Sequence, residues 1–207
     1  MTSSVIFDMD DTLLATREVK WAHHRQVARD HYGIELTDEV LGRHWGEPFD
    51  QMIGHLYQHS ASVDQMRAAN QASAHLFPKQ AIPGAVDVVT HLLDRGLTVG
   101  VLTSMNTANA LVDLSRCGFP MNLLAFVQGA DETPHHKPDP RVFTPALETL
   151  HAMGSTEVTY VGDALIDERA AVGAGLRFVA VTTGLFAAEA FGESPVIGSL
   201  VDLPALV

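Results

Sequence analysis

The sequence predicts an α/β fold, in which a Rossmann-like parallel sheet core carries helices on both faces and an all-α helical segment is inserted after the first strand. Three observations lead to this prediction. Residues 5–7 form a short apolar, β-prone run that ends in a cluster of aspartates. From Gly84 onward, strand-like runs alternate with single helical stretches, which is typical of right-handed crossovers between parallel strands. Residues 16–78 contain helical stretches and no good strand.

Composition narrows the class of protein. With 207 residues and 46% hydrophobic residues, the chain can bury a sizeable core and is too apolar for disorder. No apolar run is long enough to span a bilayer, no basic region precedes an apolar run, and the single cysteine, Cys117, excludes an internal disulfide framework. A formal net charge of −12 argues against nucleic acid as a partner. We therefore expect a cytoplasmic monomer or homodimer with no nucleic-acid or membrane partner.

The sequence of residues 16–78, the segment after the first strand, predicts four helices. Gly33 follows the first of them, and Ser62 with Gln65 three residues later forms a capping-box pattern before the fourth. The stretch KQAIPGA then returns the chain to the sheet. The four helices are expected at residues 17–31, 38–44, 49–59 and 63–77.

In the region from Gly84 onward, where strands and helices are expected to alternate, several helix ends can be recognised in the sequence. Gly96 and Gly118 each follow a helical stretch, while Asp139 and Pro140 are typical of a helix start. The expected helices are 84–95, 107–117, 140–153 and 165–174. The expected strands are 98–103, 124–127, 158–161 and 177–182.

Polar side chains follow the predicted strands at the points where they end. Because ligands bind at the carboxyl ends of parallel strands, we expect these side chains to share one site. Several carboxylates at one site need a cation, and oxygen-only ligands favour Mg²⁺. The side chains concerned are Asp8, Asp10 and Thr12, then Thr103 and Ser104, then Lys137, and then Asp163 and Asp167.

Four motifs in this order resemble those of the haloacid-dehalogenase-like hydrolases. They are D-M-D-D-T at residues 8–12, Thr103, K-P-D at 137–139 and G-D-A-L-I-D at 162–167. The resemblance covers nearly the whole chain, and the helical segment lies where this family inserts its type-1 cap. It implies a core domain of residues 1–15 and 79–207 and an α-helical cap domain of residues 16–78.

The resemblance also implies a reaction. Asp8 would be the nucleophile of a Mg²⁺-dependent phosphatase and would form an aspartyl-phosphate with a small phosphorylated metabolite. Asp10 would act as general acid and then as general base, and would offer its backbone carbonyl to the metal. Thr103 and Ser104 would contact the phosphoryl oxygens, and Lys137 would neutralise their charge.

The implied metal ligands are all aspartates. Asp8 and Asp163 would bind Mg²⁺ together with Asp10, while Asp167 would either bind it or orient a bound water. Asp11 stands where the family most often has glycine, and we expect it to be structural, because aspartate tolerates the left-handed conformation.

Alternatives remain open at this level. Asp10 favours a phosphatase of the phosphoglycolate-phosphatase-like branch or a phosphomutase of the β-phosphoglucomutase kind, over the dehalogenase and P-type ATPase branches. A non-catalytic regulatory protein on the same scaffold is a third possibility, against which the intact motifs argue. Asn106 would either contact substrate or cap a helix.

Three residues of the expected cap segment are candidates for contact with the substrate. Arg43 would either recognise substrate or lie on a solvated face, and Lys20 and His24 are candidates of the same kind. The adjacent histidine pairs 23–24 and 135–136 point apart on a helix, so we expect no histidine metal site.

Overall fold

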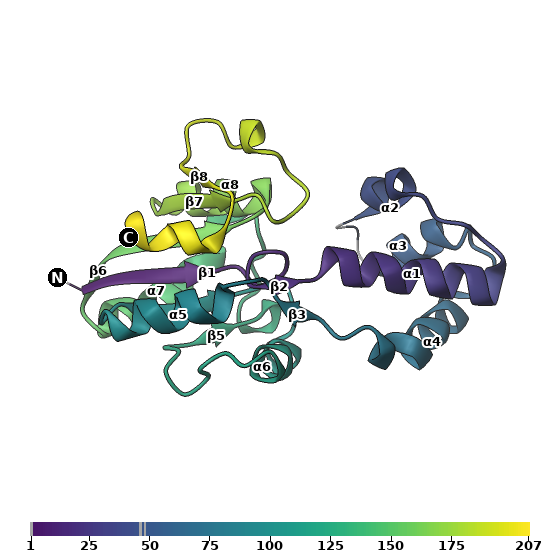
Figure 1. Ribbon diagram of the computed structural model, residues 1–207, viewed down its shortest axis with the longest axis horizontal. Coiled ribbons are helices and arrows are strands. Elements are labelled where there is room, and N and C mark those ends of the chain that lie inside the picture. The colour runs from purple at the N-terminus through teal and green to yellow at the C-terminus, as the bar shows by residue number, and fades with distance from the viewer. Residues whose placement is uncertain (1, 46, 48) are drawn as a thin grey trace. The chain divides into compact units, whose positions relative to one another are not determined.

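The computed structural model describes residues 2–207 except residues 46 and 48 (Figure 1). The chain divides into two compact units, one formed by Met1–Ala15 with Gln80–Val207 and the other by Thr16–Lys79. Among the described residues, no helix combines the length and the hydrophobicity needed to cross a membrane.

The first unit is built on six parallel strands in the order β5-β4-β1-β6-β7-β8. At the end of β1, Phe7 lies opposite Val101 of β4 and Val161 of β6, so the carboxyl ends of the three central strands are level. The strands are β1 (Thr2–Phe7), β4 (Thr98–Leu102), β5 (Val127–Gln128), β6 (Ser155–Gly162), β7 (Arg177–Val181) and β8 (Val196–Ile197).

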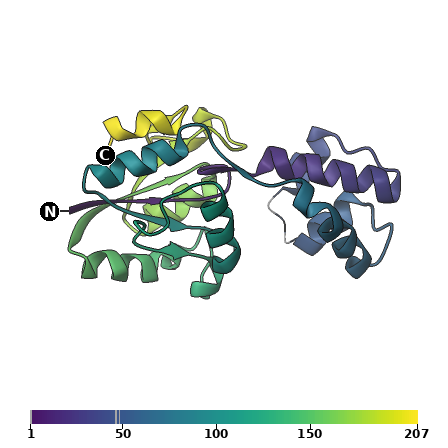
Figure 2. The ribbon, with the colours of Figure 1, turned by 60° about the horizontal axis from the view of Figure 1, so that its bottom comes forward.

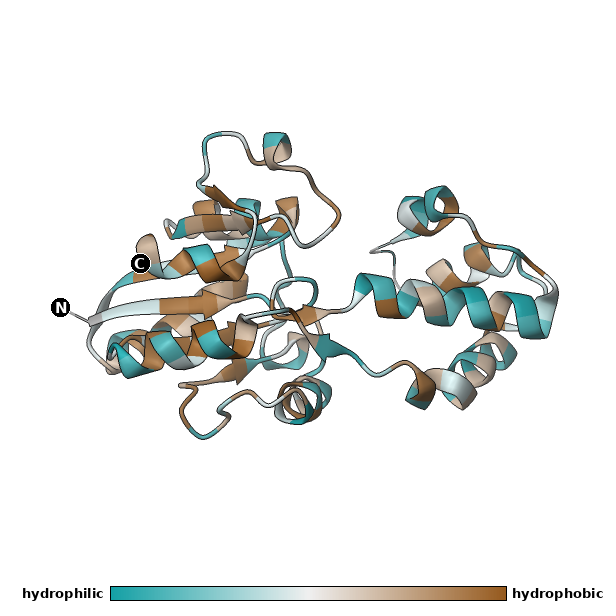
Figure 3. Ribbon diagram, in the orientation of Figure 1, coloured by the Kyte–Doolittle hydropathy of each residue, from teal (hydrophilic) through white to brown (hydrophobic). Residues whose placement is uncertain are grey.

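Two hydrophobic clusters lie on the two faces of this sheet. Val5 and Phe7 of β1 belong to the cluster under α5 (Ala85–Asp94), α6 (Thr107–Arg116) and η5 (Leu200–Ala205). Ile6, which points the other way, belongs to the cluster under α7 (Thr144–Ala152) and α8 (Leu165–Gly173). Figure 2 shows α5 and α7 on opposite faces, and Figure 3 shows hydrophobic residues along the central strands. The predicted α/β fold is confirmed.

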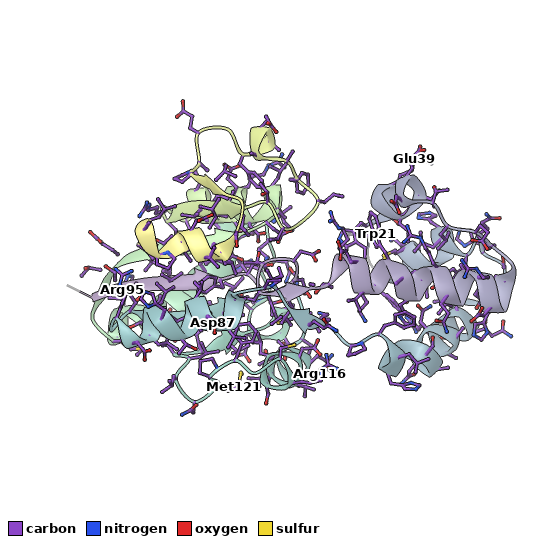
Figure 4. The ribbon with its side chains drawn as sticks, in the orientation of Figure 1. Trp21, Glu39, Asp87, Arg95, Arg116 and Met121 are labelled. Carbon is purple, nitrogen blue, oxygen red and sulfur yellow. The ribbon has the colours of Figure 1, made fainter. Side chains whose placement is uncertain are left out.

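The C-terminal segment is held to the first unit by a side chain at the end of α5. The guanidinium of Arg95, labelled in Figure 4, donates hydrogen bonds to the backbone oxygens of Pro204 and Val207. Leu200 and Leu203 of η5 are fully buried in the cluster under α5. The end of the chain therefore completes the core on this face.

Several predicted bounds differ from the observed ones. The helix predicted at 140–153 begins as a 3₁₀ turn, η3 (Pro140–Phe143), because Pro145 has no N–H to continue an α-helical ladder. The strand predicted at 124–127 is the two-residue β5, which starts at Val127. Strand β8 was not predicted, since two residues show no periodicity.

A small antiparallel pair, also not predicted, joins the two ends of the insertion. Leu14 of β2 (Leu14–Ala15) lies opposite Ala81 of β3 (Gln80–Ala81). The points where the chain leaves and re-enters the first unit are therefore neighbours.

The second unit contains only helices among its described residues. Its core includes Val27, Leu41, Ile53, Leu56 and Met66, all almost fully buried. The helices are α1 (Arg17–Tyr32), α2 (Asp38–His44), α3 (Phe49–Leu56), α4 (Val63–Ser73) and the 3₁₀ turn η1 (Ala74–Leu76).

Local signals explain where these helices begin and end. The predicted capping box is present, with Gln65 N–H donating to Ser62 Oγ and Ser62 N–H donating to Gln65 Oε1. Helix α3 ends three residues earlier than predicted, because Gln58 and His59 adopt positive φ angles of 53° and 51°.

Candidate active site

The loop after β1 places Asp8 at the carboxyl edge of the sheet. Its backbone N–H donates to Val161 O at 2.8 Å, so the parallel ladder continues to this residue, and it is only 5% exposed. The following turn is closed by Leu13 and Leu14, whose N–H groups both donate to Met9 O at 2.9 Å. Asp11 has a φ of 59° in this turn, as expected for the residue that stands in place of glycine.

Lys137 is the centre of a buried polar cluster. Its Nζ lies 2.5 Å from Oδ1 of Asp8, 2.6 Å from Oδ1 of Asp167 and 3.2 Å from the hydroxyl of Tyr160. An ammonium has three protons to donate, and these three partners accept them. The position and protonation of Lys137 are therefore set by residues from the loop after β1, from β6 and from α8.

Asp167 and Asp163 bring two more carboxylates to the same place. Ligand oxygens of Asp8, Asp163 and Asp167 all lie within 4.8 Å of one another, and all three residues are buried. Thr12 Oγ1 donates to Asp163 Oδ1 at 3.0 Å. Asp167 uses its second oxygen, Oδ2, to accept the N–H of Ala164 at 3.1 Å, which ties it to the start of α8.

Two glycines make room for these carboxylates. A Cβ atom at Gly162 would lie 2.7 Å from the carboxyl carbon of Asp167. A Cβ atom at Gly184 would lie 1.8 Å from Oδ2 of Asp163. No larger residue fits at either position without moving a carboxylate, so the packing of these glycines shapes the site.

Burial is the first influence on the pKa values of this cluster, and the charges of its members come second. Burial raises the pKa of Asp8, and the charges of Asp167 and Asp10 raise it further, although Lys137 opposes the shift. Burial and then the charge of Asp8 raise the pKa of Asp163. Burial disfavours the Lys137 ammonium, but Asp167 and Asp8 outweigh it and hold the pKa of Lys137 well above its usual value. The Lys137 ammonium contacts two of the three carboxylates, those of Asp8 and Asp167.

Such a cluster fits a hard divalent cation. The converging donors are carboxylate oxygens only, and burial, followed by the charges of neighbouring carboxylates, raises the pKa values of Asp8 and Asp163, so that their ionised forms need a stabilising partner. Oxygen donors of this kind match Mg²⁺ better than a softer metal.

The three candidate residues that follow β4, which are Thr103, Ser104 and Asn106, lie in different environments. Thr103 is almost fully buried, and its Oγ1 accepts the N–H of Met105 at 3.1 Å, which leaves the hydroxyl proton available to donate. Ser104 is exposed. Asn106 Oδ1 accepts the N–H of Ala108 at 3.0 Å, so Asn106, rather than Thr103 or Ser104, caps α6.

Asp10 differs from the other three acidic candidates. It is half-buried, and its carboxylate is not among the three that converge within 4.8 Å. Its charge raises the pKa of Asp8, so the two carboxylates interact. Its contact with a metal through the backbone carbonyl stays a prediction.

The sequence of the chain matches the family described as haloacid dehalogenase-like hydrolase over residues 5–181. The chain belongs to this family. Phosphoglycolate phosphatase of Cereibacter sphaeroides (strain ATCC 17029 / ATH 2.4.9) is 35% identical over 189 residues, which cover 87% of this chain and 85% of that protein. The family and this relative together show that the chain is a phosphatase-type hydrolase.

One further relative is much longer than this haloacid dehalogenase-like hydrolase, and one solved structure matches it over its full length. The chloroplastic Protein SUPPRESSOR OF QUENCHING 1 of Arabidopsis thaliana is 27% identical over 199 residues, which cover 88% of this chain but only 18% of that protein. A crystal structure from Thermotoga maritima, provisionally assigned as a beta-phosphoglucomutase, superimposes with a TM-score of 0.84 at 21% identity, covering 100% of this chain and 98% of that one. At this identity the structural likeness shows the fold alone.

Two residues that contact the buried polar groups of this hydrolase were not predicted from the sequence. Tyr160 is fully buried in β6 and touches both Lys137 and Asp167 through its hydroxyl. A tyrosine in a buried strand needs a polar partner for its hydroxyl, and that signal was available. Gly184 lies beyond the four motifs, and no pattern indicated that it touches Asp163.

The cap candidates of this hydrolase lie in two environments within the second unit. Arg43 is exposed on α2 and pairs with Glu39, labelled in Figure 4, at 2.7 Å. Lys20 and His24 line a cavity of about 510 Å³ together with residues of α1, α3 and α4. Burial lowers the pKa of His24 to about 3, so its imidazole is neutral. A role in substrate recognition stays a prediction for all three.

Proposed function

We propose that this hydrolase is a Mg²⁺-dependent phosphatase that acts on a small phosphorylated metabolite and forms an aspartyl-phosphate on Asp8. The observation that carries the proposal is the buried contact of the Lys137 ammonium with Asp8 beside two further carboxylates. Residues 1–15 and 79–207 would form the core domain, and residues 16–78 the cap domain.

Asp8 is the nucleophile in this proposal. Lys137 engages its Oδ1, and in this proposal Oδ2 is the attacking oxygen. This oxygen forms a bond to phosphorus while the bond between phosphorus and the ester oxygen breaks. Lys137 keeps the carboxylate oriented and balances charge as the phosphoryl group arrives.

Asp10 moves the protons. It gives a proton to the leaving ester oxygen, which departs as an alcohol, and then takes a proton from the water that attacks phosphorus. The bond to Asp8 breaks in this second step, and inorganic phosphate leaves. Its half-buried position next to Asp8 supports a role in which it exchanges protons with water and substrate.

The remaining roles in the proposed reaction, phosphate binding and metal binding, fall to Thr103, Ser104 and the aspartates. The hydroxyl proton of Thr103 would bind a phosphoryl oxygen, with Ser104 as a neighbouring contact. Asp8, Asp163 and the Asp10 carbonyl would hold Mg²⁺, which when bound supplies positive charge at the phosphoryl oxygens. Asp167 would orient a ligand rather than bind directly, because Lys137, Tyr160 and the Ala164 N–H already engage both of its oxygens.

A screen of the purified protein against a panel of phosphorylated metabolites tests the function. We expect inorganic phosphate release from at least one small ester, loss of release with EDTA and recovery with Mg²⁺. Ca²⁺ should substitute poorly because its larger, looser coordination shell misplaces the phosphate. Full turnover in EDTA would remove the argument for a metal.

The same screen separates the alternatives. Transfer of phosphate between positions of a sugar without net release would favour the phosphomutase. Absence of turnover, together with tight binding of a partner protein, would favour the regulatory protein. The D8N variant is the matched control, since asparagine keeps the size of the side chain but removes the nucleophile.

We further propose a cytoplasmic monomer or homodimer with no nucleic-acid or membrane partner. The single cysteine and the net charge of −12 support this. Light scattering of the purified protein gives its oligomeric state, and fractionation of source cells gives its location.

A further inference from the structure

A second group of potential metal ligands lies in the helical unit, at the junction between α2 and α3. His44, at the end of α2, has its Nδ1 2.9 Å from Oε1 of Glu47. His55, in the last turn of α3, has its Nδ1 2.8 Å from Oε2 of the same carboxylate. Ligand atoms of the three residues lie within 4.8 Å of one another. One glutamate therefore joins two histidines that are 11 positions apart.

The donors differ in kind from those beside Asp8. Two imidazole nitrogens and one carboxylate oxygen suit Zn²⁺ and related transition metals, whereas the cluster around Asp8 offers oxygen only. Three protein ligands with a fourth position open to water are also the usual arrangement of an accessible zinc site. Side-chain exposures of 19% for His44, 30% for Glu47 and 43% for His55 leave the group open to solvent.

We infer that His44, Glu47 and His55 form a binding site for a divalent transition-metal ion, with Zn²⁺ as the ion that fits the donors best. The site is independent of the proposed phosphatase reaction, because it uses none of the residues assigned to that reaction. A bound ion would cross-link the end of α2 to the last turn of α3.

The present geometry is close to that of a metal-bound state. Two ligands on one tetrahedral Zn²⁺ lie about 3.3 Å apart, as bond lengths of about 2.0–2.1 Å require. The observed Nδ1–Oε distances of 2.9 and 2.8 Å are shorter, so each pair has to open by about half an ångström. In the contacts with Glu47 each imidazole donates from Nδ1. A metal binds at Nδ1 only when that nitrogen carries no proton, as in the imidazole tautomer that is protonated at Nε2.

A hydrogen-bonded network that merely joins the two helices is the competing explanation. The charge-assisted hydrogen bonds from His44 and His55 lower the pKa of Glu47, which is what such a network would also produce. The two explanations differ in whether an added metal ion binds at these residues, and that difference is measurable.

Titration of the full chain with Zn²⁺ by calorimetry tests the inference. The protein is first saturated with Mg²⁺, so that the carboxylates near Asp8 are occupied. We expect one Zn²⁺ per chain at this site and an affinity at least about 100-fold lower in H44N and in H55N. X-ray absorption at the zinc edge should show nitrogen ligands at about 2.0–2.1 Å in the unmodified protein.

Two further variants keep the test decisive. H31N changes an exposed histidine at the end of α1, outside the group, and should bind Zn²⁺ as the unmodified protein does. E47Q can still hydrogen-bond to both histidines but loses the carboxylate, so it should stay folded and bind Zn²⁺ weakly. If H44N, H55N and H31N bind Zn²⁺ equally, or if the unmodified protein binds none, the inference is overturned and the group is a structural network.

Discussion

Gly184 lies so close to Asp163 that a Cβ atom on the glycine would be 1.8 Å from Oδ2 of the aspartate. The distance is far below any van der Waals contact, so the absence of a side chain at Gly184 is what allows the Asp163 carboxylate to occupy its place. Thr12 holds the other oxygen of this carboxylate by donating its hydroxyl proton to Oδ1.

Gly184→Ala should therefore impair metal binding. The methyl group must push the Asp163 carboxylate away or move its own loop. We expect the Mg²⁺ concentration for half-maximal activity to rise about 10- to 100-fold. Gly198→Ala is the matched control, because a Cβ at Gly198 meets nothing within 4 Å. An unchanged Mg²⁺ dependence in Gly184→Ala would show that the carboxylate does not need this position.

Asp8→Asn and Asp10→Asn should fail at different steps. Asp8→Asn has no nucleophile, so turnover and covalent capture of phosphate should disappear together. Asp10→Asn keeps the nucleophile and loses the proton donor, a contribution worth about 10²–10⁴-fold. With p-nitrophenyl phosphate, whose leaving group needs no proton, the first step should partly recover.

Mass spectrometry of acid-quenched samples locates the phosphate. Asp10→Asn should accumulate more phosphate on Asp8 than the unmodified enzyme does, since the attacking water lacks its base. Phosphate on Asp10 or on Ser104 would contradict the assigned roles.

Tyr160→Phe tests whether the buried hydroxyl positions Lys137. Removal of the hydroxyl takes away one of three acceptors of the Lys137 ammonium and one contact of Asp167. The two carboxylate contacts remain, so we expect kcat to fall about 10-fold with little change in KM, and stability to change by about 1 kcal/mol. Tyr32→Phe makes the same chemical change in the helical unit and should leave kcat unaltered. Equal kcat values in all three proteins would assign Tyr160 a packing role only.

The raised carboxyl pKa values predict how the stability of the metal-free protein depends on pH. The pKa of Asp8 is raised to about 7 and that of Asp163 to about 9, both first of all by burial. A carboxyl with a raised pKa binds more protons in the folded than in the unfolded state, so the free energy of unfolding falls as pH rises through these values.

At lower pH, two histidines change the free energy of unfolding in the opposite direction. Burial lowers the pKa of His23 and of His24, which makes the protein more stable as pH rises toward about 6.5. Urea unfolding between pH 7 and 9 therefore avoids the range in which the histidines act and covers the range of the carboxyls. In EDTA we expect stability to decline over this range, and with saturating Mg²⁺ the decline should be much smaller because the bound ion keeps the carboxylates ionised. A rise in stability with pH in EDTA over the same range would contradict the prediction.

The type of fold was predictable from the amino-acid sequence, as were most of the side chains that meet at the carboxyl edge of the sheet. Helix ends at Gly96, Gly118 and Ser62 are local signals, because a cap or a left-handed residue acts on its own turn of helix. The placement of Asp8, Thr103 and Asp163 was also predictable, since parallel strands bring their carboxyl ends to one edge of the sheet.

Which of these groups touch one another depends on how the whole chain packs. Lys137 is 129 positions from Asp8, and their contact depends on strand order, register and the path of a loop without periodicity. The same holds for Tyr160 beside Lys137, for Gly184 beside Asp163 and for the pair of strands β2 and β3.

The group of His44, Glu47 and His55 shows most clearly what could not be predicted from the sequence. The sequence drew attention to histidines that are neighbours in the chain and predicted that their side chains point apart, but the rings of His23 and His24 stack at 5.8 Å. His44 and His55, 11 positions apart, meet at Glu47 because α2 and α3 pack against each other. Helix periodicity and helix caps depend on residues a few positions apart, so they can be recognised in the sequence. Contacts between side chains that are far apart in the chain form only when the whole chain has packed.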